Sequence, residues 1–507
     1  MTTLQLSLPD PVASSNRTLD TNPKNLGSWL DNLPYLAVVE TVQEISDRLY
    51  LLNRNQVPAG QRMKLMEQFH TACQRLHESL IDIQLSLTGR LDPNDAIKEG
   101  ERLHCEMAFG YKLLVSDSVA LQRSLMKPQE IALAVERAIH YLSLYTIQHY
   151  QTYTMINRSL WREISVLYRY GEQKGLLEQR ILSPTKHAKT TIADTFKRIA
   201  FLRISDPYQL PPGNVWDVFN YLGRHKDNIE IQSSQEGATR AGVLFIDISR
   251  DKSKDTELED SEKYSLNGRA LIESLITDLE KIRTGGQPVD VGFSERISRA
   301  DTVQLGTRLL NLWARTPQRV MPRFSGSGTT HLIIGLNAIH SRLLHKHPVP
   351  NIEMGDIPCS RLNRSTGGLA LLCPKQYAPR LLIGQAAAVG ISTPSESTQW
   401  LPVIIRWLMK IDEKSVQFGI QYVGDKMTPA RVRTLDAKPK ERTTHDALKL
   451  ELRHSSRTLQ TIIAPSGVFR KGHKIELIQG DQTSTIRCAQ LLESLTTTDR
   501  FSYHSQT

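Results

Sequence analysis

The sequence contains no apolar run long enough to cross a membrane, and its five cysteines form no CxxC pair. A membrane-spanning helix needs roughly 18 or more apolar residues, whereas the best candidate, 401–411, contains Arg406 and Lys410. The N-terminus lacks a charged region followed by an apolar stretch, so no signal peptide is predicted. Scattered cysteines are typical of a reducing compartment. These absences favour a cytoplasmic protein without a membrane span.

The signatures of common enzymes are missing as well. The sequence has no P-loop GxxxxGK[ST], no HExxH, no GxSxG and no cysteine and histidine spacing of a zinc site. His340, His345 and His347 lie close together in the sequence, but solvated loop residues are a better interpretation than metal ligands. We therefore expect a binding protein and not an enzyme, with no catalytic residue, no metal and no cofactor.

The positive charge of the chain is concentrated in its C-terminal part. The formal net charge is +10, yet residues 1–300 hold 36 lysines and arginines against 38 acidic residues, while residues 301–507 hold 27 against 15. A basic C-terminal part favours an anionic ligand, a nucleic acid or a membrane surface. A basic surface without any partner explains the charge alone equally well.

The hydrophobic periodicity indicates an α+β multidomain protein. At about 100–200 residues per domain, a chain of this length contains three or four folded units. Apolar residues recur at helical spacing up to about residue 190, whereas a period of two dominates beyond residue 320. The helical spacing is exemplified by Val42, Ile45, Leu49 and Leu52. The predicted units are a disordered leader (1–30), an α-helical bundle (31–190), a small α/β module (191–300), a β-barrel (305–435) and a second small β unit (445–507).

Two short motifs follow one another in the basic part. The segment RTPQRVMPRF places Arg315, Arg319 and Arg323 at four-residue intervals. The segment NRSTGG, followed by the strand-like LALL, fits the pattern [D/N]xSxxG with Asn363, Ser365 and Gly368. Alternating apolar residues on both sides of a DEK turn at 412–414 then predict a β-hairpin, and KIELIQ followed by TSTIRC predicts another near the C-terminus.

The motifs in this order, with the hairpin after them, resemble the PilZ family over roughly residues 310–430. Members of that family bind cyclic di-GMP with arginines at the mouth of a β-barrel and a [D/N]xSxxG loop on its surface. The resemblance implies that a PilZ-type barrel binds the nucleotide as a ligand, not a cofactor. The implied ligand-binding residues are Arg319, Arg323, Asn363, Ser365 and Gly368, with Arg315 as a further candidate. This chain departs from the family in having Asn363 where Asp is commoner, and in a helix-like insert at 325–355.

The residue types suit a ligand with two phosphates and two guanines. The arginine fork can donate to the N7 and O6 acceptors of guanine or to a phosphate, and its flat face can stack on a base. Pro317 and Pro322 disfavour a regular helix, so the arginine segment is predicted to be a linker that closes over the nucleotide. Asn363 and Ser365 supply short polar groups, although a turn that only caps a strand would need no ligand.

The predicted function is a cyclic di-GMP receptor that contacts an unidentified protein partner through its N-terminal helical half. The resemblance implies an output in type IV pili, motility, adhesion or biofilm. Two alternatives remain: an RNA- or DNA-binding β-barrel that uses the same basic surface, and a degenerate PilZ scaffold that binds only protein. Nucleic acid is the less favoured partner because aromatic residues, on which bases stack, make up only 6% of the chain.

Overall fold

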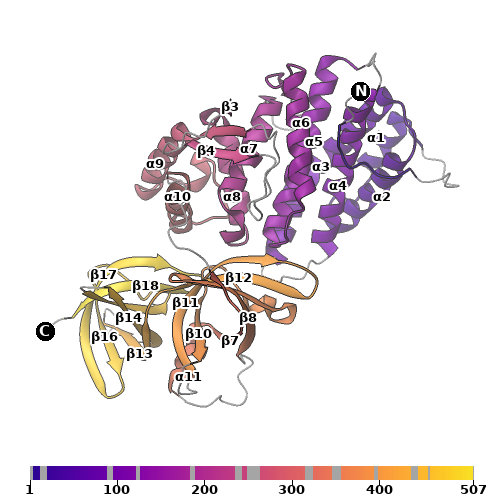
Figure 1. Ribbon diagram of the computed structural model, residues 1–507. Coiled ribbons are helices and arrows are strands. Elements are labelled where there is room, and N and C mark those ends of the chain that lie inside the picture. Colours follow the sequence, from indigo (N-terminus) through magenta and orange to yellow (C-terminus); the bar gives the residue numbers. More distant parts are fainter. Residues whose placement is uncertain are drawn as a thin grey trace. The chain divides into compact units, whose positions relative to one another are not determined.

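The computed structural model of the 507-residue chain divides into two compact units. One unit comprises residues 1–207 and 212–317, and the other comprises residues 318–507 with the short segment 208–211. Helices dominate the first unit and strands the second (Figure 1). The structure describes residues 4–11, 20–87, 95–120, 126–182, 189–234, 243–247, 263–314, 324–344, 356–392, 398–435, 443–454 and 457–505.

The first unit begins with a bundle of helices. In chain order these are α1 (Pro23–Asp31), α2 (Val38–Arg54), α3 (Ala59–Leu87), α4 (Asp95–Ala120), α5 (Pro128–Gln151) and α6 (Arg158–Gln173). Helix α4 packs against α2, α3 and α5. The predicted apolar face of α2 is buried, since Val42, Ile45 and Leu49 have no exposed surface. This burial confirms the helical interpretation of the periodic pattern.

Helix α1 lies in the stretch that we expected to be a disordered leader. The Asn22 side chain accepts a hydrogen bond from the backbone N–H of Lys24, and Pro23 occupies the first helical position. Both features favour the start of a helix. Leu26 and Leu30 are buried, and the helix packs against α3. The expectation is therefore wrong for residues 23–30, because a nine-residue helix contains too few turns to show a periodic pattern.

A small module completes the first unit. Its longer helices are α7 (Ile192–Ile204), α8 (Asn214–Arg224), α9 (Arg269–Arg283) and α10 (Arg299–Trp313). Its strands are β1 (Ile181–Leu182), β2 (Lys189–Thr190), β3 (Glu230–Ser234), β4 (Val243–Asp247) and β5 (Lys263–Asn267). Strands β3, β5 and β4 form an antiparallel sheet in that order. Short 3₁₀ turns lie at Pro207–Gln209, Lys226–Asn228 and Pro288–Val291.

Helix α10 is anchored to α7 by an aromatic residue. The Trp313 ring meets the Phe201 ring edge-on at 5.3 Å between centroids, and its Nε1–H donates to Ser205 Oγ at 3.0 Å. The module thus extends past residue 300.

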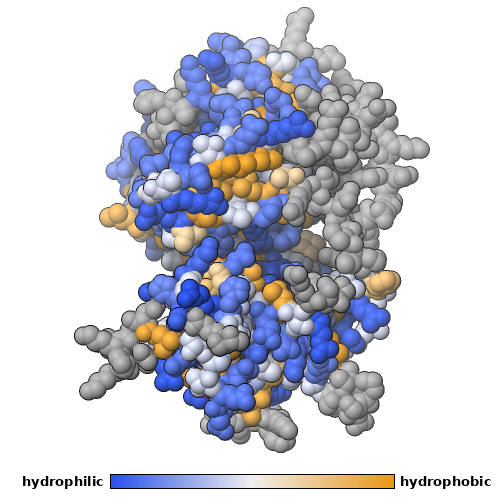
Figure 2. Space-filling view, turned by 90° about the vertical axis from the view of Figure 1, so that its left-hand side faces the viewer, coloured by the Kyte–Doolittle hydropathy of each residue, from blue (hydrophilic) through white to orange (hydrophobic). Residues whose placement is uncertain are grey.

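On the face of the first unit seen in Figure 2, apolar side chains gather within a mostly hydrophilic surface. Ile276 of α9 and Val289 are exposed apolar residues of this module.

The second unit contains two antiparallel barrels, of which the first begins with β6 (Phe324–Ser325). Its other strands are β7 (Thr329–Ile334), β8 (Ile357–Ser365), β9 (Gly368–Pro374), β10 (Ala386–Ser392), β11 (Thr398–Lys410) and β12 (Ser415–Tyr422), with a 3₁₀ turn at Lys375–Arg380. The sheet order is β6-β8-β7-β10-β11-β12-β9, and β9 returns to pair with β8, which closes the ring. The pairing of β11 with β12 confirms the predicted hairpin.

The second barrel is built from the six C-terminal strands. They are β13 (Lys426–Thr434), β14 (Thr444–His454), β15 (Arg457–Pro465), β16 (Lys474–Gln479), β17 (Gln482–Ser494) and β18 (Thr498–Ser505), in the closed order β13-β14-β15-β18-β17-β16. Pairing of β16 with β17 confirms the C-terminal hairpin. Strand β13 lies within the range 305–435 that we assigned to the first barrel, but it pairs with β14 and β16.

Helix α11 (Leu336–Leu344) connects the two barrels. It forms from the helix-like insert and packs against β7 and β10 of the first barrel and against β13 and β14 of the second. Ile339 of this helix, Ala388 and Leu450 belong to one buried apolar cluster. The predicted α+β multidomain class is confirmed. No helix among the described residues has the length and apolar character that a bilayer crossing requires.

Candidate functional site

The predicted polar turn joins β8 to β9. Asn363 and Ser365 lie near the end of β8, Gly368 begins β9, and Ser365 is paired with Gly368 across the hairpin. Asn363 and Ser365 are half-buried, and the two turn residues between the strands are exposed. A β-bulge lies between Arg361 and Asn363, and bulges bend a strand and redirect its side chains. The structure thus keeps the three predicted turn residues together on one accessible hairpin.

Gly368 has a role in the fold that needs no ligand. A Cβ atom at this position would lie 2.0 Å from the carbonyl oxygen of Ile420 on β12. Only glycine allows the two strands to approach so closely. The Ser365 hydroxyl donates to the Gly368 carbonyl oxygen at 3.3 Å, which stabilises the hairpin. Packing of the strands therefore accounts for a glycine at position 368 and for one hydrogen bond of Ser365. It does not account for an asparagine at position 363.

The three predicted arginines precede this barrel in the sequence. Arg315, Arg319 and Arg323 lie outside the residues that the structure describes, so their predicted contacts stay a prediction. The first described residue after them is Phe324, with which β6 begins. Its side chain is 60% exposed.

Strand β6 lies beside the strand that carries the polar turn. Phe324 is paired with Arg364, and Ser325 is paired with Asn363. The backbone N–H of Gly326 donates to the carbonyl oxygen of Leu362 at 3.1 Å, which continues this pairing. The arginine segment therefore runs directly into a strand that is hydrogen-bonded beside Asn363.

Two further arginines surround the turn, and the sequence analysis did not single them out. Arg361 lies before the bulge on β8, where its Nη2 donates to the Ser327 carbonyl oxygen at 3.2 Å. Arg364 is exposed, and no hydrogen bond or ion pair holds its guanidinium within the described part of the chain. Burial raises the pKa of Tyr422 on β12, and the positive charges of Arg361 and Arg364 oppose this rise. The density of arginine around NRSTGG was the available sequence signal for this positively charged surface.

A chain of polar contacts leads from the turn to the second barrel. Gln421 of β12 is the strand partner of Gly368, and its side-chain oxygen accepts a hydrogen bond from Arg406 Nε at 2.7 Å. The two terminal nitrogens of Arg406 bind the carboxylate of Glu493 on β17, one of them at 3.0 Å. A guanidinium group that binds a carboxylate through two nitrogens makes a strong, directional contact. The turn and the second barrel are thus joined through three side chains, those of Gln421, Arg406 and Glu493.

The described residues do not form a metal site with three His, Cys, Asp or Glu ligands. Of the three clustered histidines, His345 and His347 lie outside the described residues. His340 lies on α11 and is buried, with its Nδ1 3.5 Å from a carboxylate oxygen of Asp446. The expectation of a solvated loop residue is therefore wrong for His340, because the helix turns this side chain towards the second barrel.

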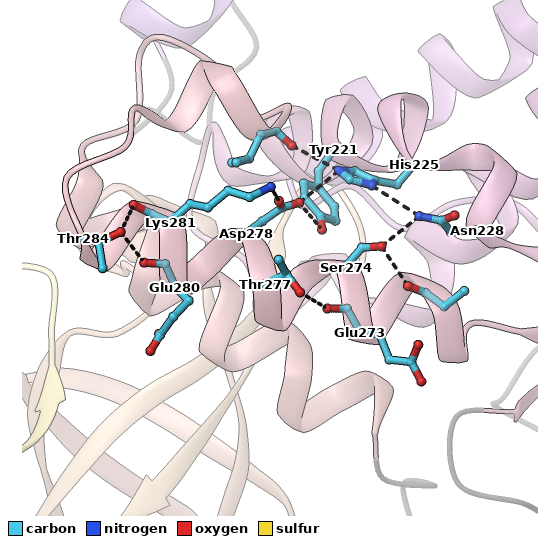
Figure 3. A network of polar contacts seen from close by, with 12 residues as sticks. Tyr221, His225, Asn228, Glu273, Ser274, Thr277, Asp278, Glu280, Lys281 and Thr284 are labelled. Atoms are coloured by element: carbon cyan, nitrogen blue, oxygen red, sulfur yellow. Dashed lines mark hydrogen bonds and ion pairs between the residues drawn. The ribbon is translucent and has the colours of Figure 1, made fainter.

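A buried polar network in the small module is a second place where ionisable groups gather (Figure 3). The Tyr221 hydroxyl of α8 donates to Asp278 Oδ2 of α9 at 3.2 Å, and His225 Nε2 lies 3.2 Å from the same oxygen. Lys281 Nζ donates to the other carboxylate oxygen at 2.9 Å. Burial and the neighbouring Asp278 raise the pKa of Tyr221, so its hydroxyl remains a donor. Both oxygens of Asp278 have partners, and the network joins α8 to α9.

Two family models match this chain, one on each side of the first barrel. The model of the N-terminal domain of the cyclic-di-GMP receptor FimW matches residues 24–236, which include the helical bundle. The model of the FimW C-terminal β-barrel domain matches residues 430–506, most of the second barrel. Neither match includes the polar turn at 363–368.

A curated relative extends this similarity along nearly the whole chain. It is the cyclic-di-GMP receptor FimW of Pseudomonas aeruginosa, which is 22% identical over 95% of this chain and 90% of the relative. The two matching models describe domains of a receptor, which is a binding protein and not an enzyme, as predicted. They belong to one receptor and together match more than half of the sequence. The chain is therefore similar to the cyclic-di-GMP receptor FimW in two of its domains and along nearly its whole length.

Proposed function

We propose that this chain is a cyclic di-GMP receptor and that the nucleotide binds where β6, β8 and β9 meet in the first barrel. We interpret this barrel as PilZ-type. One observation carries the placement: β6, which follows the arginine segment directly, is paired with β8 at Asn363 and Arg364. Phe324, the residue after Arg323, thus lies at the same sheet edge as Asn363, although Arg323 and Asn363 are 40 residues apart in the sequence.

The side chains at this edge suit the two parts of the ligand. Arg319 and Arg323, with Arg315 as a further candidate, would donate to guanine edges and phosphates. The exposed guanidinium of Arg364 adds a positive charge beside the turn. Asn363 offers an amide for hydrogen bonds to a guanine edge. Ser365 offers a hydroxyl that can accept from the ligand while it donates to the Gly368 carbonyl oxygen.

Titration calorimetry with cyclic di-GMP tests both the ligand and the site. The wild-type chain should release or absorb heat with a saturable profile, and Arg319→Ala and Ser365→Ala should weaken binding. Arg364→Ala should weaken it as well, by roughly 5- to 50-fold if a charge-assisted contact is lost. Arg487→Ala is the matched control, because Arg487 is an equally exposed arginine on β17 of the second barrel.

The outcomes separate the proposal from its alternatives. No heat with cyclic di-GMP would exclude a receptor and leave a barrel that binds only protein. Heat that is unchanged in Arg319→Ala and Ser365→Ala would exclude the site while keeping the ligand. A parallel titration with a single-stranded oligonucleotide tests the nucleic-acid alternative, and binding there without cyclic di-GMP binding would favour it.

We place the output of this receptor in the cytoplasm and in its N-terminal helical unit. All five cysteines are free thiols, which is consistent with a reducing compartment. Ligand binding would order the arginine linker and change how it packs, a disorder-to-order switch. The PilZ resemblance supports an output in type IV pili, motility, adhesion or biofilm. Co-purification of a partner by the first unit only in the presence of cyclic di-GMP would test this coupling.

A further inference from the structure

A cavity in the first unit is lined by an unusual set of polar groups. It lies where the end of α3, the start of α4, the end of α5 and the start of α8 meet, and it is a small hollow that is partly open to solvent. Its polar walls are Gln84, Gln148, Gln151 and Trp216, together with Thr152. Leu85 and Ile97 form the apolar part.

Four N–H donors in this cavity wall are buried and have no hydrogen-bond partner among the described residues. They are the side-chain nitrogens of Gln84, Gln148, Gln151 and Trp216. These residues are 6%, 2%, 8% and 3% exposed, respectively. A buried donor without a partner costs about 1–3 kcal/mol, and native proteins rarely keep several such donors together. Four of them around one space indicate a bound group that accepts hydrogen bonds.

The side-chain oxygens of two of the amides face other groups of the protein. Gln151 Oε1 accepts the backbone N–H of Gly213 at 3.0 Å. Gln148 Oε1 lies 3.0 Å from His104 Nδ1, and burial lowers the pKa of His104 to about 3, so that this ring is neutral and can donate from one nitrogen. Both amide nitrogens are therefore left for other acceptors.

Gly100 of α4 brings two of the donors together. A Cβ atom at this position would lie 2.5 Å from the Nε2 atoms of both Gln84 and Gln148. Any other residue would therefore push these two amides apart. The glycine lets two N–H donors from different helices approach the same point.

Four N–H groups exceed what one water molecule can accept, because a water oxygen has two lone pairs, whereas a halide ion can accept from all four. The oxygens of Gln148 and Gln151 already have one contact each, to His104 Nδ1 and to the backbone N–H of Gly213, respectively. The Thr152 hydroxyl donates to the backbone carbonyl of Gln148 at 3.1 Å. The lining contains no carboxylate that would repel negative charge. We propose that this cavity binds a small inorganic anion such as chloride through the four neutral N–H groups.

Crystals of the full chain grown in sodium bromide test this proposal directly. Bromide is a close analogue of chloride and has an anomalous X-ray signal. The expected result is an anomalous peak in the cavity, in contact with the side-chain nitrogens of Gln148, Gln151 and Trp216. Density for water without an anomalous peak in bromide would overturn the proposal.

Thermal unfolding gives an independent measurement in solution. At matched ionic strength, sodium chloride should raise the Tm of the wild-type first transition by about 2–4 °C relative to sodium gluconate, because a ligand that binds only the folded state stabilises it. Trp216→Phe removes one donor and keeps an aromatic ring, and it should lose at least half of this shift. The control Trp29→Phe makes the same substitution on α1, outside the cavity. An equal chloride shift in wild type and Trp216→Phe would contradict the proposal.

Discussion

The helical unit and the barrel unit differ in whether charged side chains are buried in their interiors. The helical unit buries whole ion pairs, such as Lys112 with Glu163 at 2.7 Å and Arg137 with Glu136 at 2.8 Å. The two barrels instead have cores of apolar residues, such as the cluster around Phe501. Arg364 of the first barrel is exposed beside the polar turn.

The difference in charge burial indicates which surfaces of each unit can bind a charged partner. A buried ion pair has satisfied its charges inside the protein, so it can specify how helices pack but cannot attract a ligand. An exposed arginine beside a polar turn keeps its donors available. The uneven charge of the sequence thus reflects two kinds of unit. Acidic and basic residues balance in the helical unit, whereas the barrel unit has an excess of positive charge.

The largest effect that we predict comes from breaking a buried pair of the helical unit. Lys112→Met leaves the Glu163 carboxylate buried without its cation, although the backbone N–H and the hydroxyl of Ser7 still donate to it. We expect a loss of about 3–5 kcal/mol in the free energy of unfolding, measured with urea, because an uncompensated buried charge remains. The control Lys375→Met breaks a pair with Glu413, whose side chain is 94% exposed, and should cost less than about 1 kcal/mol. Equal losses in both variants would refute the contrast between the units.

The next effect concerns strand packing at the polar turn. Gly368→Ala places a methyl group against the Ile420 carbonyl oxygen and should lower the unfolding free energy of the barrel unit by about 1–3 kcal/mol. Gly367→Ala is the matched control, since the nearest atom to its added methyl group, beyond the adjoining residues, would be Ser365 Oγ at 4.0 Å. If both substitutions left stability unchanged while Gly368→Ala abolished cyclic di-GMP binding, the glycine would serve the ligand and not the fold.

A buried carboxyl of the helical unit gives a pH dependence. Burial raises the pKa of Asp217 to about 6, so the folded protein holds a proton there more tightly than the unfolded chain does. The stabilisation from this proton is complete below about pH 4 and is lost as the pH rises to about 6. Asp217→Asn should remove this loss and be more stable than wild type by about 1–3 kcal/mol at pH 7, but not at pH 4. Urea unfolding at both pH values would show it, and a constant difference would contradict the assignment.

The smallest predicted change sharpens the proposed site itself. Asn363→Asp restores the residue that is commoner in the PilZ pattern, and a carboxylate is a stronger acceptor for guanine N–H groups than an amide. We expect cyclic di-GMP affinity to rise roughly fivefold, equivalent to about 1 kcal/mol, in calorimetry. Asn220→Asp on α8 adds the same charge at an exposed position of the first unit and should leave affinity unchanged. Weaker binding of Asn363→Asp would indicate that this residue faces a phosphate.

Local sequence patterns predicted the helices and strands, but they could not predict contacts between residues that are far apart in the chain. The period of Val42, Ile45 and Leu49 identified a helix face because every third or fourth residue shares one burial environment. The turn with Asn363 and Ser365 was recognised because its signal lies within six residues. The pairing of Lys112 with Glu163 spans 51 residues, and no local period encodes it.

The same limit applies to the candidate site. The approach of β6 to Asn363 depends on strand order, which the sequence does not display. Strand β13 alternates in the same manner as its neighbours, so its pattern could not show which barrel it would join. Arg364 lay inside the quoted motif, but only its exposure, and the absence of a hydrogen-bond or ion-pair partner among the described residues, distinguish it from a structural arginine.

Arg406 holds one residue from each barrel at the same time. Its guanidinium contacts Gln421, the neighbour of the polar turn, and Glu493, which lies in the strand region matched by the C-terminal family model. A shift of β12 would therefore strain the hydrogen bond between Gln421 and Arg406, and the same guanidinium is bound to Glu493 of β17. This series of contacts gives an event at the turn a physical path to the surface of the C-terminal barrel.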